Sequence, residues 1–335
     1  MFWHIFTNSP GEGFNRQSKD MKKIPVVDLR KYTSGDEAKR AEFVQEIGDA
    51  FRQIGFVVVK NHGIPTSLVD DFYRLSHEFF ALPEGVKSQY ELPELAGQRG
   101  YTSFGREHAK GFDKPDLKEF FQIGQELEGE ELLGEEYPEN VFVREVPDFV
   151  PTGIALYRIF ELTGGKLLQA IARYLGLEER YFDDKIRYGN SILRSIYYPP
   201  ITEEPASAIR AEQHEDINLI TLLVGASAGG LQVLNQAGEW IEAMPAEDEI
   251  VINVGDMLQR LTNNYLPSTT HRVVNPPRER WHEPRLSIPF FLHPRSEMDL
   301  SCLPQCVTED RPLQYAPITA GAYLDERLRE IGLKK

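Results

Sequence analysis

A chain of 335 residues, of which 41% are hydrophobic and 27% charged, has the composition of a soluble globular protein and can bury a sizeable core. Its formal net charge of −15 argues against nucleic acid as a partner, because phosphate binding requires clustered Lys and Arg side chains. No apolar run approaches the roughly 18 residues that span a membrane. We therefore expect neither a nucleic acid nor a membrane as a partner.

The N-terminal part of the chain alternates apolar strands with helical patterns. The apolar runs at residues 24–29 and 56–60 predict two strands. Between them, apolar residues at helical spacing predict a helix that begins with a capping box formed by Ser34 and Glu37 and ends at Gly55. Residues 1–20 show neither a signal-peptide pattern nor a periodicity, and we expect them to form a disordered extension.

Residues 97–112 differ from the segments around them, because glycines are interspersed with aromatic and basic side chains. Such composition is typical of loops that bind ligands. We expect a loop over the mouth of a barrel, in which Tyr101, Arg106 and Phe112 are candidate substrate contacts. The alternative is a surface loop with buried aromatic residues.

Two further segments precede the predicted barrel. Residues 126–139 contain seven Glu among fourteen residues and predict a solvated acidic loop. Residues 152–175 show a long helical pattern, in which the pair Gly164-Gly165 is a candidate kink.

From Ser191 onward the pattern changes to short strands separated by turn residues. About eight such strands suit a double-sheet jelly roll. The predicted strands are residues 191–197, 214–224, 231–234, 240–243, 249–253, 257–261, 271–274 and 285–291. Thr319 is expected to cap a last helix at residues 320–331.

These patterns predict a mainly β protein with flanking helices. Its core is a double-stranded β-helix, or jelly roll, wrapped by N-terminal helices and a C-terminal helix. We expect a wrapping region at residues 21–190, the jelly-roll core at 191–295 and a C-terminal segment at 296–335. Because no Gly/Ser-rich linker separates them, we expect one integrated unit.

The most informative residues are His214 and Asp216, which precede an apolar run rich in Ile, Thr, Leu and Val. In a strand, residues i and i+2 point to the same face, so that an imidazole and a carboxylate would lie side by side. On a helix this spacing would place them roughly 200° apart. A third ligand, His271, opens another predicted strand. Two His and one Asp suit the facial triad of non-haem Fe(II) oxygenases.

Arg285 and Ser287 form another i, i+2 pair in a predicted strand. A planar guanidinium beside a hydroxyl suits a two-bond grip on a carboxylate. An H-x-D pair or a lone His is weak evidence of a metal site, because most histidines have structural roles. The ordered set of His-x-Asp, His and Arg-x-Ser, each in a strand context, is far more specific. His293 follows a core strand and is a candidate for facing the same cavity.

The chain resembles the isopenicillin N synthase-like group of Fe(II)/2-oxoglutarate-dependent dioxygenases from Ile24 to about Leu333. The stretches that match are residues 24–29, 55–63, 116–121, 197–200, 230–233 and 253–256, together with His271-Arg272-Val273 and Arg285-Leu286-Ser287. Such ordered coverage is specific for the family and much less specific for one substrate.

The resemblance implies that His214, Asp216 and His271 bind Fe(II), which leaves positions for 2-oxoglutarate and O2. The far carboxylate of 2-oxoglutarate would then reach Arg285, with hydrogen bonds from Ser287 and Tyr198. Arg194 lies where relatives often place a basic residue near the cosubstrate. The implied reaction converts 2-oxoglutarate to succinate and CO2 while a small-molecule substrate undergoes hydroxylation, desaturation or ring closure.

Three alternatives remain at this point. Some relatives keep the Arg-x-Ser pair and oxidise their substrate without 2-oxoglutarate. A jelly-roll protein could also hold a metal or ligand without turnover, and two His with one carboxylate also suit a zinc hydrolase. The two cysteines, Cys302 and Cys306, are too few for a disulfide framework, so we expect reduced thiols and a cytoplasmic protein.

Overall fold

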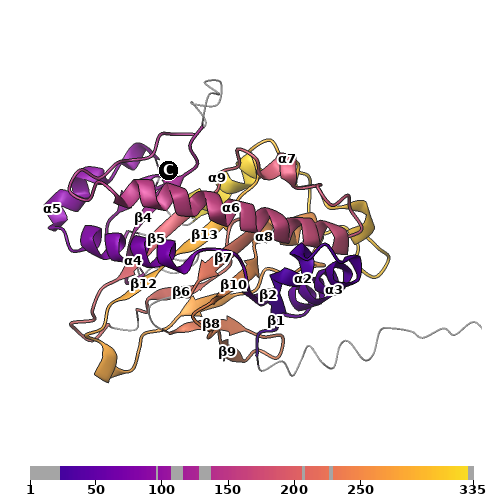
Figure 1. Ribbon diagram of the computed structural model, residues 1–335, viewed down its shortest axis with the longest axis horizontal. Coiled ribbons are helices and arrows are strands. Elements are labelled where there is room, and N and C mark those ends of the chain that lie inside the picture. The colour runs from indigo at the N-terminus through magenta and orange to yellow at the C-terminus, as the bar shows by residue number, and fades with distance from the viewer. Residues whose placement is uncertain are drawn as a thin grey trace, which may run out of the picture.

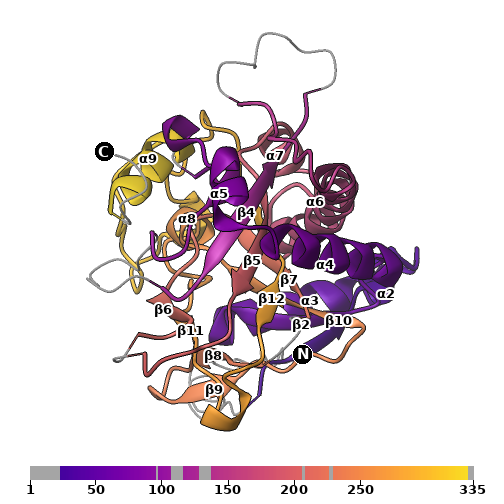
Figure 2. The same ribbon diagram turned by 90° about the vertical axis from the view of Figure 1, so that its left-hand side faces the viewer.

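Two β-sheets face each other at the centre of the protein, and helices cover the outer side of the larger sheet (Figure 1, Figure 2). The computed structural model describes residues 23–95, 97–106, 116–127, 137–205, 208–225 and 229–330. Residues 1–20, expected to be an extension, lie outside this range. The predicted jelly-roll core with flanking helices is confirmed.

The large sheet contains nine strands, in the order β1-β2-β10-β7-β13-β5-β4-β3, and β12 also pairs with β5. Strands of the predicted wrapping region therefore extend the core sheet at both edges. The bounds are β1 Val26–Asp28, β2 Phe56–Lys60, β3 Gly100–Thr102, β4 Glu119–Gly124, β5 Ile192–Tyr198, β7 Ile220–Val224, β10 Glu249–Val254, β12 Arg285–Ser287 and β13 Pro289–Leu292.

The small sheet contains four strands in the order β6-β11-β8-β9. Their bounds are β6 Ala211–His214, β8 Leu231–Leu234, β9 Trp240–Glu242 and β11 His271–Val273. An apolar cluster with members from both sheets, among them Phe56, Val251, Val233 and Val273, fills the space between them. This inter-sheet space is the interior of the jelly roll.

The helices form the outer layer and one end of the molecule. Their bounds are α2 Leu29–Thr33, α3 Glu37–Ile54, α4 Thr66–Phe80, α5 Glu84–Lys87, α6 Phe149–Tyr174, α7 Asp183–Ile186, α8 Asp256–Leu261 and α9 Ala320–Glu330. Short 3₁₀ helices lie at Ser88–Tyr90, Pro93–Leu95, Arg278–Arg280 and Pro304–Cys306. No helix in these described segments is long and apolar enough to cross a membrane.

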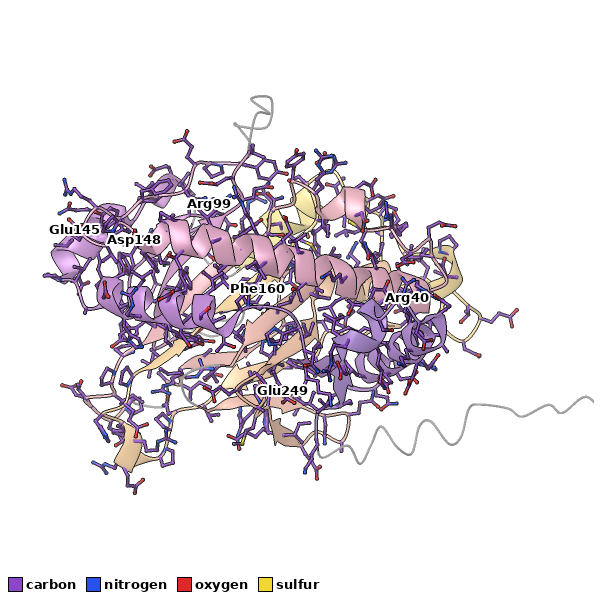
Figure 3. The ribbon with its side chains drawn as sticks, viewed as in Figure 1. Arg40, Arg99, Glu145, Asp148, Phe160 and Glu249 are labelled. Atoms are coloured by element: carbon purple, nitrogen blue, oxygen red, sulfur yellow. The ribbon has the colours of Figure 1, made fainter. Side chains whose placement is uncertain are left out.

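Helix α6 runs across the large sheet and packs on its outer face (Figure 1). Phe160, labelled in Figure 3, stacks on Phe290 of β13 with ring centroids 5.4 Å apart. The helix is continuous through Gly164 and Gly165, where the sequence suggested a kink. Gly164 instead allows close approach, since a Cβ atom there would lie 2.7 Å from Leu292.

Several local predictions were wrong, and each has a physical reason. The cap of α3 is Asp36, whose side chain accepts hydrogen bonds from Ala38 N and Lys39 N, and not Ser34. Residues 257–261, predicted as a strand, belong to helix α8, because a short apolar run does not distinguish the two structures.

Two predicted segments differ at their boundaries. Residues 285–291 form two strands, β12 and β13, and Pro289, which lacks a backbone N–H, begins the second. Residues 100–102, predicted as loop, pair with β4 as strand β3. The C-terminal cap was predicted correctly, since Ala322 N donates to Thr319 Oγ1 at 3.3 Å.

Gly55 ends α3 in the left-handed region, with φ of 68°, and a Cβ atom there would lie 2.4 Å from Pro267 O. We predict that Gly55→Ala lowers the free energy of unfolding by about 2 kcal/mol or more, because left-handed strain adds to this clash. Gly35→Ala is the control, since Gly35 has φ of 78° and nothing within 4 Å of its added Cβ. It should cost about 1 kcal/mol. Equal losses in denaturant titrations would contradict the role of the clash.

Candidate metal centre

His214, Asp216 and His271 converge at one end of the inter-sheet space. His214 ends β6 and lies directly opposite His271, which begins β11. Asp216 Oδ1 lies 3.7 Å from His214 Nε2 and 3.6 Å from His271 Nε2. One candidate ligand atom from each residue lies within 4.8 Å of the others. Ligands bound at about 2.1 Å to one ion lie roughly 3 Å apart, so this arrangement needs little adjustment to hold a metal.

The reason for this convergence differs from the one that the sequence suggested. Residues 214–224 do not form one strand, because β6 ends at His214 in the small sheet and β7 begins at Ile220 in the large sheet. Asp216 lies in the connection between the sheets. The two imidazoles meet through the pairing of β6 with β11, and the carboxylate joins them where the chain crosses over.

Hydrogen bonds orient each candidate ligand. His214 Nδ1 lies 2.6 Å from the carbonyl oxygen of Glu212, and His271 Nδ1 lies 3.1 Å from that of Thr269. Because a carbonyl oxygen only accepts, each Nδ1 carries the proton and each Nε2 presents a lone pair. Thr221 Oγ1 and Asn253 Nδ2 donate to Asp216 Oδ2 at 2.6 and 2.8 Å. Oδ1 is therefore directed toward the histidines.

Charge and burial also suit a divalent cation. Burial, and next the nearby His214, lower the pKa of His271, so its imidazole is neutral at neutral pH. Burial raises the pKa of Asp216, but His271, His214 and the two hydrogen bonds outweigh it, so the pKa lies below its usual value. Two neutral nitrogens and one carboxylate oxygen form the donor set that non-haem Fe(II) takes.

One face of the large sheet extends from this centre toward the predicted cosubstrate residues. Residues directly opposite each other in antiparallel strands share a face. Thr221, which holds Asp216, is opposite Phe291, and Phe291 is opposite Ile192. Since side chains alternate along a strand, Arg194 and Tyr198 of β5 lie on this same face.

Arg285 and Ser287 lie further along that face. Arg285 is opposite Tyr198, and Ser287 is opposite Ile196. Tyr198 and Ile196 both belong to the apolar cluster between the sheets, so Arg285 and Ser287 also face the inter-sheet space. The Arg285 guanidinium carbon lies 5.0 Å from the centroid of the Tyr198 ring. Arg285 is only 2% exposed.

A cavity of about 590 Å³ opens beside the candidate metal ligands. Its lining includes His214 and Asp216, and His293, a predicted site residue, also borders it. The C-terminal helix α9 forms one wall, where Tyr323 OH donates to Asp256 Oδ2 of α8 at 2.8 Å. Burial raises the pKa of Asp256 to about 7.

The other predicted substrate contacts lie elsewhere. Tyr101 is buried in β3, where it donates a hydrogen bond to Glu119 and packs edge-on against Phe79. Arg106 is exposed and pairs with Glu91 at 2.7 Å. Neither residue lines the cavity beside the metal ligands. Phe112 lies outside the described residues.

The sequence did not reveal several residues of the site. Gln122 of β4 lies opposite Arg194 and accepts a hydrogen bond from Arg194 Nε at 2.7 Å. The Arg194 guanidinium lies over the rings of Phe120 and Phe291, at 4.2 and 5.1 Å from their centroids. Asn253 of β10 donates a hydrogen bond to Asp216. Strand register alone brings these residues together, and no local motif marks them.

Comparison with known proteins agrees with this geometry. Residues 24–145 match the family model of the N-terminal region of non-haem dioxygenases in morphine synthesis, and residues 189–294 match the 2OG-Fe(II) oxygenase superfamily. The chain is 33% identical to flavanone 3-dioxygenase 2 of Oryza sativa subsp. japonica, over 90% of this chain and 82% of that protein.

Solved structures agree as well. A Caulobacter crescentus protein assigned to the 2OG-Fe(II) oxygenase family is 43% identical, with a TM-score of 0.84 over 93% of this chain and 100% of that one. Neurospora crassa T7H in complex with alpha-KG and thymine is 31% identical, with a TM-score of 0.81 over 92% of this chain and 98% of that one.

The chain therefore belongs to the 2OG-Fe(II) oxygenase superfamily. It is an oxidoreductase that uses Fe(II) with 2-oxoglutarate and O2 as cosubstrates and acts on a small molecule. The family, the enzyme class and the cofactors predicted from the sequence are confirmed.

Removing a hydrogen bond to Asp216 should weaken metal binding. We predict that Asn253→Ala lowers metal affinity about 10- to 100-fold, because Asp216 loses an orienting donor. Metal titration of the purified protein measures this. Asn140→Ala is the control, since buried Asn140 bonds instead to Gly124. Similar affinity losses in both variants would indicate general destabilisation.

Proposed function

We propose that His214, Asp216 and His271 hold the Fe(II), and that the protein oxidises a C–H bond of a small polar molecule bound in the adjoining cavity. The convergence of three ligand atoms within 4.8 Å at the edge of this cavity supports the proposal. Bound iron supplies O2 activation coupled to conversion of 2-oxoglutarate to succinate and CO2. The reaction would hydroxylate, desaturate or cyclise this substrate.

The cosubstrate is assigned to the inter-sheet space. Arg285 and Ser287 would bind its carboxylate distal to the metal, with Tyr198 directly opposite Arg285. A buried guanidinium matches a carboxylate in two bonds and gains strength where water is excluded. The family resemblance suggests a place for Arg194 near the cosubstrate. It lines the open cavity, which favours a role toward the substrate.

Hydrogen-bonding groups in the cavity indicate the class of substrate. Gln122 Nε2 and His293 Nδ1 are buried and have no hydrogen-bond partner among the described residues. Burial lowers the pKa of His293 to about 3, so the imidazole is neutral. A buried donor without a partner is costly, and a ligand that accepts its hydrogen bond removes this cost. The amide nitrogen of Gln122 and the guanidinium of Arg194 are donors and favour a substrate with carbonyl or carboxylate oxygens, whereas Nδ1 of the neutral His293 can donate or accept.

The apolar lining adds a further requirement. Phe291 and Ile192 lie beside the polar groups on the same face of the sheet. A flat ring with carbonyl substituents can pack its faces on these apolar side chains and accept hydrogen bonds from the polar groups with its oxygens. Neurospora crassa T7H has been crystallised with thymine and with 5-formyluracil. Such carbonyl-bearing rings are the first compounds to test, with a flavanone as the larger alternative.

Two features of the chain bear on its cellular compartment and its partners. We place it in the cytoplasm, because Cys302 and Cys306 are both free thiols. A formal net charge of −15 disfavours nucleic acid as a partner.

Loss of the carboxylate ligand tests the metal assignment. Asp216→Ala should lower iron-dependent succinate formation by more than the roughly hundredfold cost of losing one supporting hydrogen bond. Glu215→Ala is the control, because Glu215 is an exposed carboxylate on the same connection. Succinate is measured with and without Fe(II), 2-oxoglutarate and O2. Full activity in the Asp216 variant, or equal activity with Zn²⁺, would refute the assignment.

Substrate recognition is tested on whichever compound stimulates succinate formation above background. We predict that Gln122→Leu lowers kcat/KM for that compound about tenfold or more, because a donor facing the substrate is lost. Succinate formation without substrate should change little. Gln125→Leu is the control, since buried Gln125 follows the same strand but does not line the cavity. An unchanged kcat/KM in the Gln122 variant would exclude this contact.

A further inference from the structure

A second buried arginine lies beside the residues assigned to the cosubstrate. Arg210 immediately precedes β6 of the small sheet, whereas Arg285 begins β12 of the large sheet. Their guanidinium carbons lie 5.9 and 5.0 Å from the centroid of the same ring, that of Tyr198. Both side chains are only 2% exposed. Two like charges therefore meet in the interior from opposite sheets.

The charge of Arg210 is not balanced by a nearby carboxylate. Within the described ranges, no carboxylate oxygen lies within 4 Å of it, and its Nη2 donates instead to the backbone carbonyl of Glu283 at 2.9 Å. The Glu283 carboxylate is 2.7 Å from Arg280 and partly exposed. Arg210 Nε is buried and has no hydrogen-bond partner in the described part of the chain.

This arrangement is unfavourable for the protein alone. Burial, and next the charge of Arg285, lower the pKa of Arg210 to about 10, so the guanidinium is still protonated at neutral pH. A buried charge is normally paired, because removing a charged group from water is unfavourable unless another charge compensates it. A third cation nearby, Lys118, has such a partner in Asp116 at 2.8 Å. An anionic ligand would give Arg210 the same compensation.

We propose that Arg210 is a second binding residue for 2-oxoglutarate and holds, together with Arg285, the carboxylate that points away from the metal. His214 lies four residues further along the same stretch, roughly 13 Å at strand spacing. This separation suits a five-carbon dicarboxylate that extends from the metal ligands toward an arginine side chain. The proposal rests on the assignment of Arg285 to the cosubstrate.

The second guanidinium has a consequence for selectivity. A 2-oxo acid without the distal carboxylate keeps its metal-binding end but brings no anion to Arg210, for which the described residues supply no carboxylate partner. Unpaired buried charge opposes its binding, so the site discriminates by rejecting monocarboxylates as well as by attracting dicarboxylates.

The test compares two ligands that differ only in this group. The dissociation constants of 2-oxoglutarate and 2-oxobutyrate are measured by calorimetry on Mn(II)-loaded protein, without turnover. Arg210→Gln should raise the constant for 2-oxoglutarate at least tenfold and that for 2-oxobutyrate less than twofold. Arg280→Gln is the matched control, because exposed Arg280 contacts the same Glu283, and it should alter neither constant.

The other outcomes separate this proposal from the proposed function. Equal weakening of both ligands by Arg210→Gln, or no change with 2-oxoglutarate, would refute a direct contact. If Arg285→Gln still weakens 2-oxoglutarate selectively, the proposed function stands. If Arg285→Gln has no selective effect, both fail. Should Arg210→Gln not fold, Arg210→Lys should give intermediate affinity for 2-oxoglutarate alone, and a loss with both ligands would overturn the proposal.

Discussion

The candidate metal centre depends on one backbone junction, where the chain leaves the small sheet after His214 and enters the large sheet at Ile220. Three backbone hydrogen bonds join this crossing to the start of α8: Asp256 N to Asp216 O, Gly255 N to Leu219 O and Met257 N to Asn218 O. Gly255 is required there, because a Cβ atom would lie 2.2 Å from Asn218 O. The bonds that hold the crossing therefore also hold the carboxylate against the two imidazoles.

The sequence identified the candidate ligands through an incorrect structural argument. His214 and Asp216 were expected to lie side by side because a strand alternates its faces, yet the strand ends between them. Alternation of polar and apolar residues shows where a strand can form but not where the chain changes sheets. The chemical pattern was informative because residues of a metal site must meet whatever backbone supports them. Residues 257–261 of α8 were predicted as a strand, because a short apolar run does not distinguish a strand from a helix.

Part of the cavity wall could not be predicted, because it depends on register between distant strands. Gln122 and Arg194 meet only because β4 pairs with β5, and Phe291 reaches them through β13. These three residues lie far apart in the sequence, so no sequence spacing predicts that they meet. Conversely, Tyr101 had the local composition of a binding loop, but its backbone pairs with β4 and its side chain is buried. Composition indicates that a segment is irregular only when no partner strand lies beside it.

The two proposed binding regions differ in the kind of structure that supports them. Arg285 and Tyr198 lie on paired strands between the sheets, so their positions follow from the same hydrogen bonds that form the core. The proposed substrate cavity also has a wall from α9, which is joined to the core near the candidate metal ligands by the Tyr323–Asp256 hydrogen bond. Side chains on that helix can change without altering strand register or the metal ligands. If the cosubstrate binds between the sheets as proposed, substitutions on α9 would reshape the wall of the proposed substrate cavity while the cosubstrate site stays fixed, so one fold and one iron chemistry can serve different substrates.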